Sequence, residues 1–150
     1  MANPPTLARF YLAALIFLVV SGVVYGVVVR PFLLGMKQVQ NLVSVREYAR
    51  GLEAYRARAG SYPSTLAEAI QSQPVFGHPI PVGLDLWGNP ISYSRVADGF
   101  LLVSYGRDGK PDGTNYEQLR REGKLDNAPC RDVNADQIVS DRGEHRTCGK

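Results

Sequence analysis

Two short segments of the chain carry side-chain oxygens in a pattern that could bind a metal ion. Asp108 and Asp112 lie in a loop-like stretch punctuated by glycines, and Asp132-Val133-Asn134-Ala135-Asp136 places oxygens at alternate positions. Calcium takes about six to eight oxygen ligands, which carboxylates and free loop carbonyls supply. The second segment is not an EF-hand, because Gln137 replaces the turn glycine and Gly143 replaces the final glutamate. The acids therefore indicate either a calcium site or ordinary turns, in which Asp and Asn are common.

Cys130 and Cys148 are the two cysteines, with 17 residues between them. An even pair in an exported domain commonly forms a disulfide, which would stabilise the fold by about 3 kcal/mol in the chain-entropy model. Two unpaired thiols are the alternative. A disulfide places the C-terminal part outside the cytoplasm. The flanking charges alone leave the orientation open, since Arg9 and the amino terminus oppose Arg30 and Lys37.

No residues suggest catalysis. His78 and His145 lack the spacing of a metal site or a catalytic triad, and Ser104 lacks the flanking glycines of a nucleophile elbow. No glycine-rich loop joins a strand to a helix as phosphate binding requires. The net charge is only +3, with basic and acidic residues interleaved near the C-terminus. We therefore expect no enzyme activity, no small-molecule substrate and no nucleic-acid partner.

A long apolar segment near the N-terminus must be covered by lipid or by other helices. Residues Phe10 to Val29 are uncharged and mostly apolar, and no small-x-small cleavage site follows them. This length predicts an uncleaved spanning helix instead of a signal peptide. Gly22 and Gly26 form a small-xxx-small step that would let another helix approach closely. We divide the chain into a cytoplasmic lead (1–9), a transmembrane helix (10–30), an amphipathic continuation (31–60) and an extracytoplasmic head (61–150).

The periodicity predicts one helix from about Ala8 or Arg9 to Gly60, kinked at Pro31 and about 75 Å long from Phe10 onward if unbroken. The half of this helix that follows Pro31 carries an apolar stripe at three- and four-residue steps: Val39, Leu42, Val45, Ala49, Leu52 and Tyr55. A capping box at Thr65-x-x-Glu68 predicts a short helix from Leu66 to about Ser72. Alternating residues predict strands at 91–95, 100–105 and 137–140. The fold class is α+β: a long helix on a three-stranded antiparallel sheet.

Two motifs give the head a family resemblance. Asp85-Leu86-Trp87-Gly88-Asn89-Pro90, followed by Ser104-Tyr105-Gly106-Arg107-Asp108-Gly109, resembles the C-terminal domain of the type II secretion major pseudopilins. Gly60-Ser61-Tyr62-Pro63-Ser64-Thr65-Leu66 is similar to the helix end and corner of that family, and 28–37 is similar to the middle of its long helix. The resemblance covers most of residues 10–140. It implies a structural protein of a type II secretion or type IV pilus-like machine, anchored in the bacterial inner membrane, whose partners are copies of itself or other pilin-like subunits.

The resemblance also implies calcium in the loop before the last strand. By position the ligands would be Asp108, Asp112, and Asp132 or Asp136, with carbonyls near Ser104. The stretch Thr114 to Pro129 is an insertion in that loop relative to the family.

Two departures from the family concern processing. Phe10 aligns with the first residue of the family's mature chain. The prepilin peptidase needs a glycine just before that residue, and this chain has Arg9 there. The family's glutamate four residues further on is Ala14. A chain that is not cleaved has no new amino terminus for that acid to pair with, so the two losses are consistent. We expect neither cleavage nor N-methylation at Phe10. The alternative to a filament subunit is a tethered extracytoplasmic calcium-binding or interaction domain that does not polymerise.

Overall fold

The computed structural model describes residues 4–71, 83–123 and 132–146. The chain forms two compact units, Met1–Met36 and Lys37–Lys150. Cys130, Cys148 and His78 lie outside the described residues, as does the side chain of His145. The predicted disulfide therefore stays a prediction.

The first unit is helical. Helix α1 spans Pro4–Val24, the π-helical turn η1 spans Tyr25–Val29, and α2 (Arg30–Ala59) begins within it. The helix starts earlier than predicted, since prolines fit the first turn, where backbone N–H groups have no intrahelical acceptor. The π-turn directly precedes Pro31, where a kink is predicted, and in it the Arg30 N–H donates to the Tyr25 carbonyl. Pro31 has no N–H and its ring crowds the carbonyl four residues earlier, and a wider turn relieves that crowding.

The remainder of α2 belongs to the second unit and supplies its core. Leu42, Val45, Tyr48 and Leu52 recur at three- and four-residue steps and are buried. Val39 was predicted on this stripe but is 54% exposed, and the polar residues Gln38 and Asn41 are buried in its place. The helix ends at Ala59, and Gly60 adopts a φ of 78°, the left-handed conformation that glycine tolerates best. Helix α3 then spans Leu66–Gln71.

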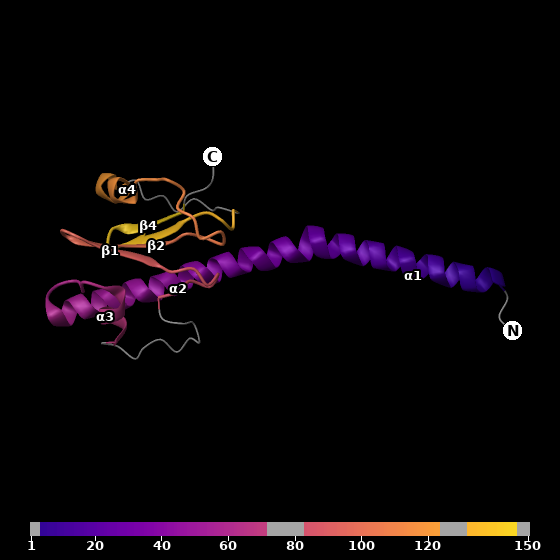
Figure 1. The fold of residues 1–150 in the computed structure, drawn as a ribbon, viewed down its shortest axis with the longest axis horizontal. Coiled ribbons are helices and arrows are strands. Elements are labelled where there is room, and N and C mark those ends of the chain that lie inside the picture. The colour runs from indigo at the N-terminus through magenta and orange to yellow at the C-terminus, as the bar shows by residue number, and fades with distance from the viewer. Residues whose placement is uncertain (1–3, 72–82, 124–131, 147–150) are drawn as a thin grey trace. The chain divides into compact units, whose positions relative to one another are not determined.

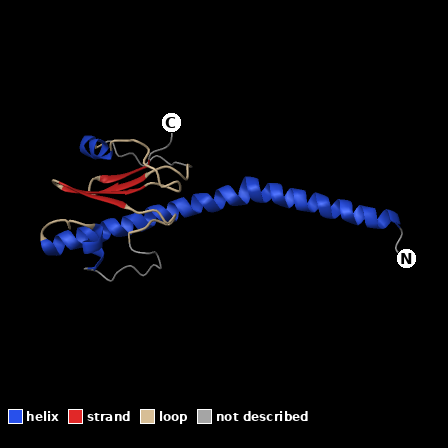
Figure 2. Ribbon diagram, in the orientation of Figure 1, coloured by secondary structure: helices blue, strands red, loops and turns tan. Residues whose placement is uncertain are grey.

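The sheet has four antiparallel strands in the order β1-β2-β3-β4 (Figures 1 and 2). They are β1 (Ser92–Val96), β2 (Gly99–Ser104), β3 (Gln137–Ser140) and β4 (Gly143–Arg146). The predicted α+β class and the three predicted strands are confirmed, and β4 is an addition to them. Val96 pairs with Gly99, so Ala97 and Asp98 form a two-residue hairpin turn.

Both faces of the sheet are covered. On one face, Phe100, Leu102 and Val139 join the buried residues of α2 and α3 in one apolar core. On the other face, Leu101, Val103 and Ile138 form a second cluster, with Tyr105 and Tyr116 packed against it. Tyr116 begins helix α4 (Tyr116–Glu122), which lies across the sheet from α2 in Figure 1. All six residues of β2 are therefore buried.

Candidate functional site

The first functional feature is the exposed apolar surface of the N-terminal helix. Among the described residues one helix is long and apolar enough to cross a membrane, and none of its most apolar window is buried. Large side chains on every side are exposed, among them Phe10, Leu15, Phe17 and Tyr25. Water does not favour so large a continuous apolar surface, so lipid or other helices must cover it.

The helix-packing residues Gly22 and Gly26 lie on this surface. A Cβ added at either would meet no atom within 4 Å. The predicted close approach of a second helix at this step therefore stays a prediction, because it concerns another chain.

The second feature is a buried polar network that joins α2 to the sheet and its loops. Asn41, which is fully buried, donates through Nδ2 to Ser104 Oγ and to Gln137 Oε1, each at 2.9 Å, and accepts from Leu86 N at 2.7 Å. Gln38 extends the network: its Nε2 donates to the Asp132 carbonyl, and its own carbonyl accepts from Gln137 Nε2 at 3.0 Å. Buried polar groups that satisfy one another fix relative positions more specifically than apolar contacts do.

Asp85 explains the Trp-Gly-Asn-Pro motif. Its side chain is buried, and Oδ1 accepts from the backbone N–H groups of Trp87 at 2.9 Å and of Asn89 at 2.8 Å. Its other oxygen, Oδ2, accepts from Ser104 Oγ at 2.7 Å. The carboxylate therefore folds its own loop into a tight turn and ties that turn to the end of β2.

Asn89 explains why this motif occurs together with the later Gly106–Gly109 motif. Its Nδ2 donates to the Gly106 carbonyl at 2.8 Å. A Cβ at Gly109, where φ is 66°, would lie 2.8 Å from Asn89 Oδ1, and one at Gly106 would lie 2.4 Å from the Asn134 carbonyl. Glycine is needed at both places because two loops pass too closely for a side chain.

The predicted calcium ligands divide into separate groups. Ser104 belongs to the buried network, while Asp108 and Asp132 each accept from a backbone N–H two residues further on, at 3.2 and 2.9 Å, as turn formers do. Asp112 and Asp136 face each other: Asp112 N donates to Asp136 Oδ2 at 3.0 Å, and Asp136 N donates to Asp112 Oδ2 at 3.3 Å. We call this reciprocal pair the aspartate clasp. Among the described residues no group of three or more His, Cys, Asp or Glu side chains could hold a metal ion.

The electrostatics of the clasp centre on Asp136, which is fully buried. Burial raises the pKa of its carboxyl, and the nearby charges of Asp112 and Asp108 raise it further. Hydrogen bonds from the Tyr116 hydroxyl and from Asp112 N oppose that shift. The pKa of the Tyr116 hydroxyl is raised in turn, first by its own burial and then by its bond to this carboxylate. Like charges gathered around a buried carboxylate are a situation that a bound cation relieves.

Helix α4 was not predicted, because Thr114 to Pro129 was interpreted only as an insertion. Local signals for it exist. Asn115 Oδ1 accepts from Gln118 N at 3.0 Å as an N-cap, and Gly123 ends the helix in the left-handed conformation. An Asn-x-x-Gln pattern followed by glycine five residues later could have located the helix.

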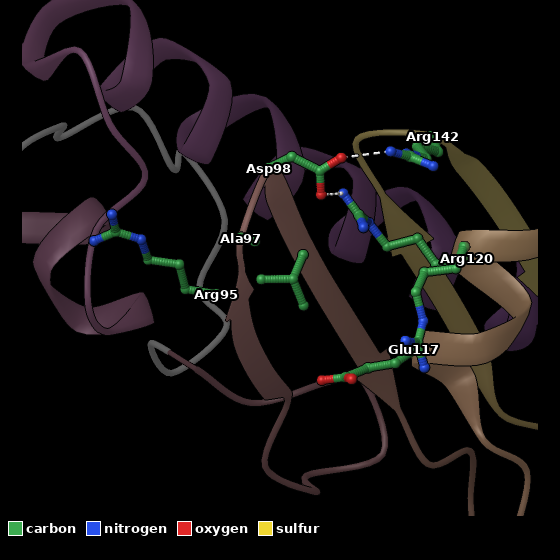
Figure 3. Close-up of a pocket in the computed structure, with 8 residues that line it drawn as sticks. Arg95, Ala97, Asp98, Glu117, Arg120 and Arg142 are labelled. Atoms are coloured by element: carbon green, nitrogen blue, oxygen red, sulfur yellow. Dashed lines mark hydrogen bonds and ion pairs between the residues drawn. The ribbon is translucent and has the colours of Figure 1, made fainter.

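Helix α4 is fixed to the hairpin by an arginine that the sequence analysis missed (Figure 3). Arg120 is 3% exposed and bonds Asp141 through Nε at 2.8 Å and through Nη2 at 2.9 Å. Its Nη2 also bonds Asp98 at 3.0 Å, and Asp98 bonds Arg142 as well. Hydrogen bonds from Arg120 above all, and from Arg142, lower the pKa of the Asp98 carboxyl. We call these four residues the arginine clamp. Three of them, Asp98, Arg120 and Arg142, line a pocket of about 460 Å³.

Comparison with known proteins agrees with the resemblance noted from the motifs. The chain is 30% identical over 83 residues to type II secretion system core protein G of Xanthomonas campestris pathovar campestris. The similarity is to a major pseudopilin. The alignment covers 49% of this chain and 57% of that relative, so it spans little more than half the relative's length. No protein-family model matches the chain, and no solved structure matches it significantly.

Proposed function

We propose that this chain is a pseudopilin-like structural component of a type II secretion or type IV pilus-like machine, anchored in the bacterial inner membrane by its N-terminal helix. The observation that carries the proposal is the exposed, uncharged helical surface over Phe10–Val29, on a chain similar to a major pseudopilin. Such a surface suits lipid before assembly and neighbouring helices after it. A structural role also accords with the absence of recognisable catalytic motifs in the sequence.

The partners we propose are the membrane and further pilin-like subunits, either copies of this chain or relatives. The buried network supports this, because it fixes the head on α2. A subunit that is stacked many times in a filament requires such a fixed head. Cysteine substitutions at Gly22 and Gly26 provide the test. We expect oxidative cross-linking between chains in membranes at these positions and none at Arg58→Cys, near the end of α2. Equal cross-linking at all three sites would contradict specific packing along the apolar helix.

Arg9 and Ala14 favour a second candidate, a tethered domain that keeps its N-terminal segment and joins no filament. Mass spectrometry of the protein isolated from membranes separates the candidates. We expect a chain that retains Arg9 and carries no methyl group on Phe10. A chain that begins at Phe10 would refute this expectation and favour the filament subunit.

We also propose that the head lies outside the cytoplasm and carries a disulfide between Cys130 and Cys148. The pairing can be read from thiol alkylation before and after reduction. Two thiols that react without reduction would contradict both the bond and the orientation inferred from it.

We propose that the head binds calcium at the aspartate clasp, where Asp112 and Asp136 would supply carboxylate oxygens and nearby loop carbonyls the rest. The burial of Asp136 beside other acids supports this. Asp108, Asp132 and Ser104 are held in other hydrogen bonds and fit the role less well. Thermal unfolding with calcium and with chelator tests it, because a ligand of the folded state raises the midpoint. We expect the increase to disappear in Asp112→Asn and to persist in Asp98→Asn. An unchanged wild-type midpoint at millimolar calcium would refute the proposal.

A further inference from the structure

One end of the second unit carries an exposed lysine stacked on a tryptophan. Lys37 Nζ lies 4.6 Å from the centroid of the Trp87 ring. Lys37 is exposed and Trp87 is partly exposed. The indole Nε1 of Trp87 is buried and has no hydrogen-bond partner among the described residues. An indole N–H is a strong donor that proteins seldom leave unsatisfied, so this ring gains by moving toward an acceptor outside the protein.

Three loops meet at this end of the unit. The loop of Trp87 contacts the loop after β2 through Asn89 and Gly106, and that loop contacts the one before β3 through a bond from Arg107 N to the Val133 carbonyl at 3.0 Å. Arg107 and Lys110 expose their side chains here, next to the exposed turn-forming acids Asp108 and Asp132. We call Lys37, Trp87, Arg107 and Lys110 the basal surface. The hairpin turn and the arginine clamp lie at the opposite end of β2.

The covalent chain keeps this surface near the anchor, whatever the arrangement of the two units. Lys37 follows Arg30 by seven residues, and seven residues reach at most about 25 Å even when fully extended. If the apolar run spans a bilayer, Lys37 and the Trp87 ring stacked on it therefore lie within reach of the lipid headgroups.

We propose that the basal surface rests on the lipid headgroups of the membrane that holds the anchor; this rests on the anchoring proposed above. The Trp87 ring suits the interface, because its apolar body enters the acyl boundary, and a rotation of the ring that frees its buried N–H lets that group bond a headgroup oxygen. Lys37, Arg107 and Lys110 present cations to anionic headgroups, and the long Lys37 stem lets its ammonium reach outward. Because two acids lie among the cations, the ring supplies most of the contact and the charges add a preference for anionic lipid.

The chain has one tryptophan, so its fluorescence reports on this surface alone. The full chain is reconstituted in vesicles of phosphatidylcholine, with or without phosphatidylglycerol, that carry a nitroxide either near the headgroup or at the end of the acyl chain. We expect Trp87 fluorescence to be lost with the shallow quencher and retained with the deep one. The loss should be greater in the vesicles that contain phosphatidylglycerol.

A charge reversal provides the matched control. Lys37→Glu should reduce shallow quenching, whereas Arg121→Glu, an equal change of charge on the exposed side of α4, should leave it unchanged. Both positions are exposed, and circular dichroism shows whether each variant keeps its helix content. Flotation of the vesicles separates two failures. A chain that does not float with lipid overturns the anchor and this inference together. A chain that floats while Trp87 resists the shallow quencher overturns this inference alone.

Discussion

The substitution Asn41→Ala tests whether the buried network holds the head on α2. It removes three hydrogen bonds. Ser104 Oγ keeps its bond to Asp85, so two groups lose this partner: the partly buried Leu86 N and the buried Gln137 Oε1. At about 1–3 kcal/mol for each group left unsatisfied, we expect a loss of about 2–6 kcal/mol. That is a large part of the stability of a domain, which is commonly about 5–15 kcal/mol.

Urea unfolding of the full chain in detergent micelles measures this loss. Trp87 fluorescence reports it directly, because Asp85 holds the Trp87 backbone in the same network. Gln40→Ala is the control, since Gln40 is exposed on the same helix and should change stability by no more than about 0.5 kcal/mol. Combining Asn41→Ala with Ser104→Ala should give less than the sum of the single effects, because the two side chains share a bond. A midpoint for Asn41→Ala equal to that of Gln40→Ala would refute the reasoning.

Three further predictions concern the rest of the head. Arg120→Ala should cost about 3–5 kcal/mol because it leaves the largely buried carboxylate of Asp141 without its cation, while the exposed Asp98 keeps Arg142; the exposed Arg121→Ala should be nearly neutral in the same urea assay. Gly109→Ala should lower the thermal midpoint more than Gly113→Ala, since both have positive φ but only Gly109 lies against another side chain; equal losses would contradict the close approach. Asp136 has a raised pKa in the folded head, so folding favours its protonated form, and its unfavourable contribution is largest above that pKa and disappears as the pH falls below the unfolded value. In chelator, Asp136→Asn should therefore stabilise the head at neutral pH more than at mildly acid pH, and a pH-independent difference would oppose this assignment.

Local signals in the sequence are strong enough to predict much of this fold. Gly60 and the Thr65-x-x-Glu68 capping box correctly place the end of α2 and the start of α3. Thr65 Oγ1 accepts a hydrogen bond from Glu68 N, as a capping box predicts. Glu68 Oε2 in turn accepts from the backbone N and the Oγ of Ser64. The two-residue turn at Ala97-Asp98 follows from the hairpin pattern. These features depend on neighbours in the chain, and periodicity and turn chemistry record such neighbours directly.

The sequence could not predict the partners that are distant along the chain. By residue type, Gln38 and Asn41 belong on the solvent-exposed side of an amphipathic helix. They are buried because their hydrogen-bond partners, Gln137 and Ser104, lie on strands more than 60 residues away in the chain. The apolar Val39 is exposed for the same reason, since the face that packs is set by where the sheet docks. The four acids also looked equivalent, and only tertiary structure separates the aspartate clasp from two simple turns.

Strand β2 is buried on both faces, so any loss of its cover exposes an apolar strand. Its sequence, Gly99-Phe100-Leu101-Leu102-Val103-Ser104, has no charge and no proline, so once uncovered it has the composition of an aggregation-prone segment. Helix α4 is the shield on one side, held by the arginine clamp. Loss of the clamp, as in Arg120→Ala, would loosen that shield and uncover the apolar face of β2. The clamp therefore protects against aggregation as well as stabilising the head.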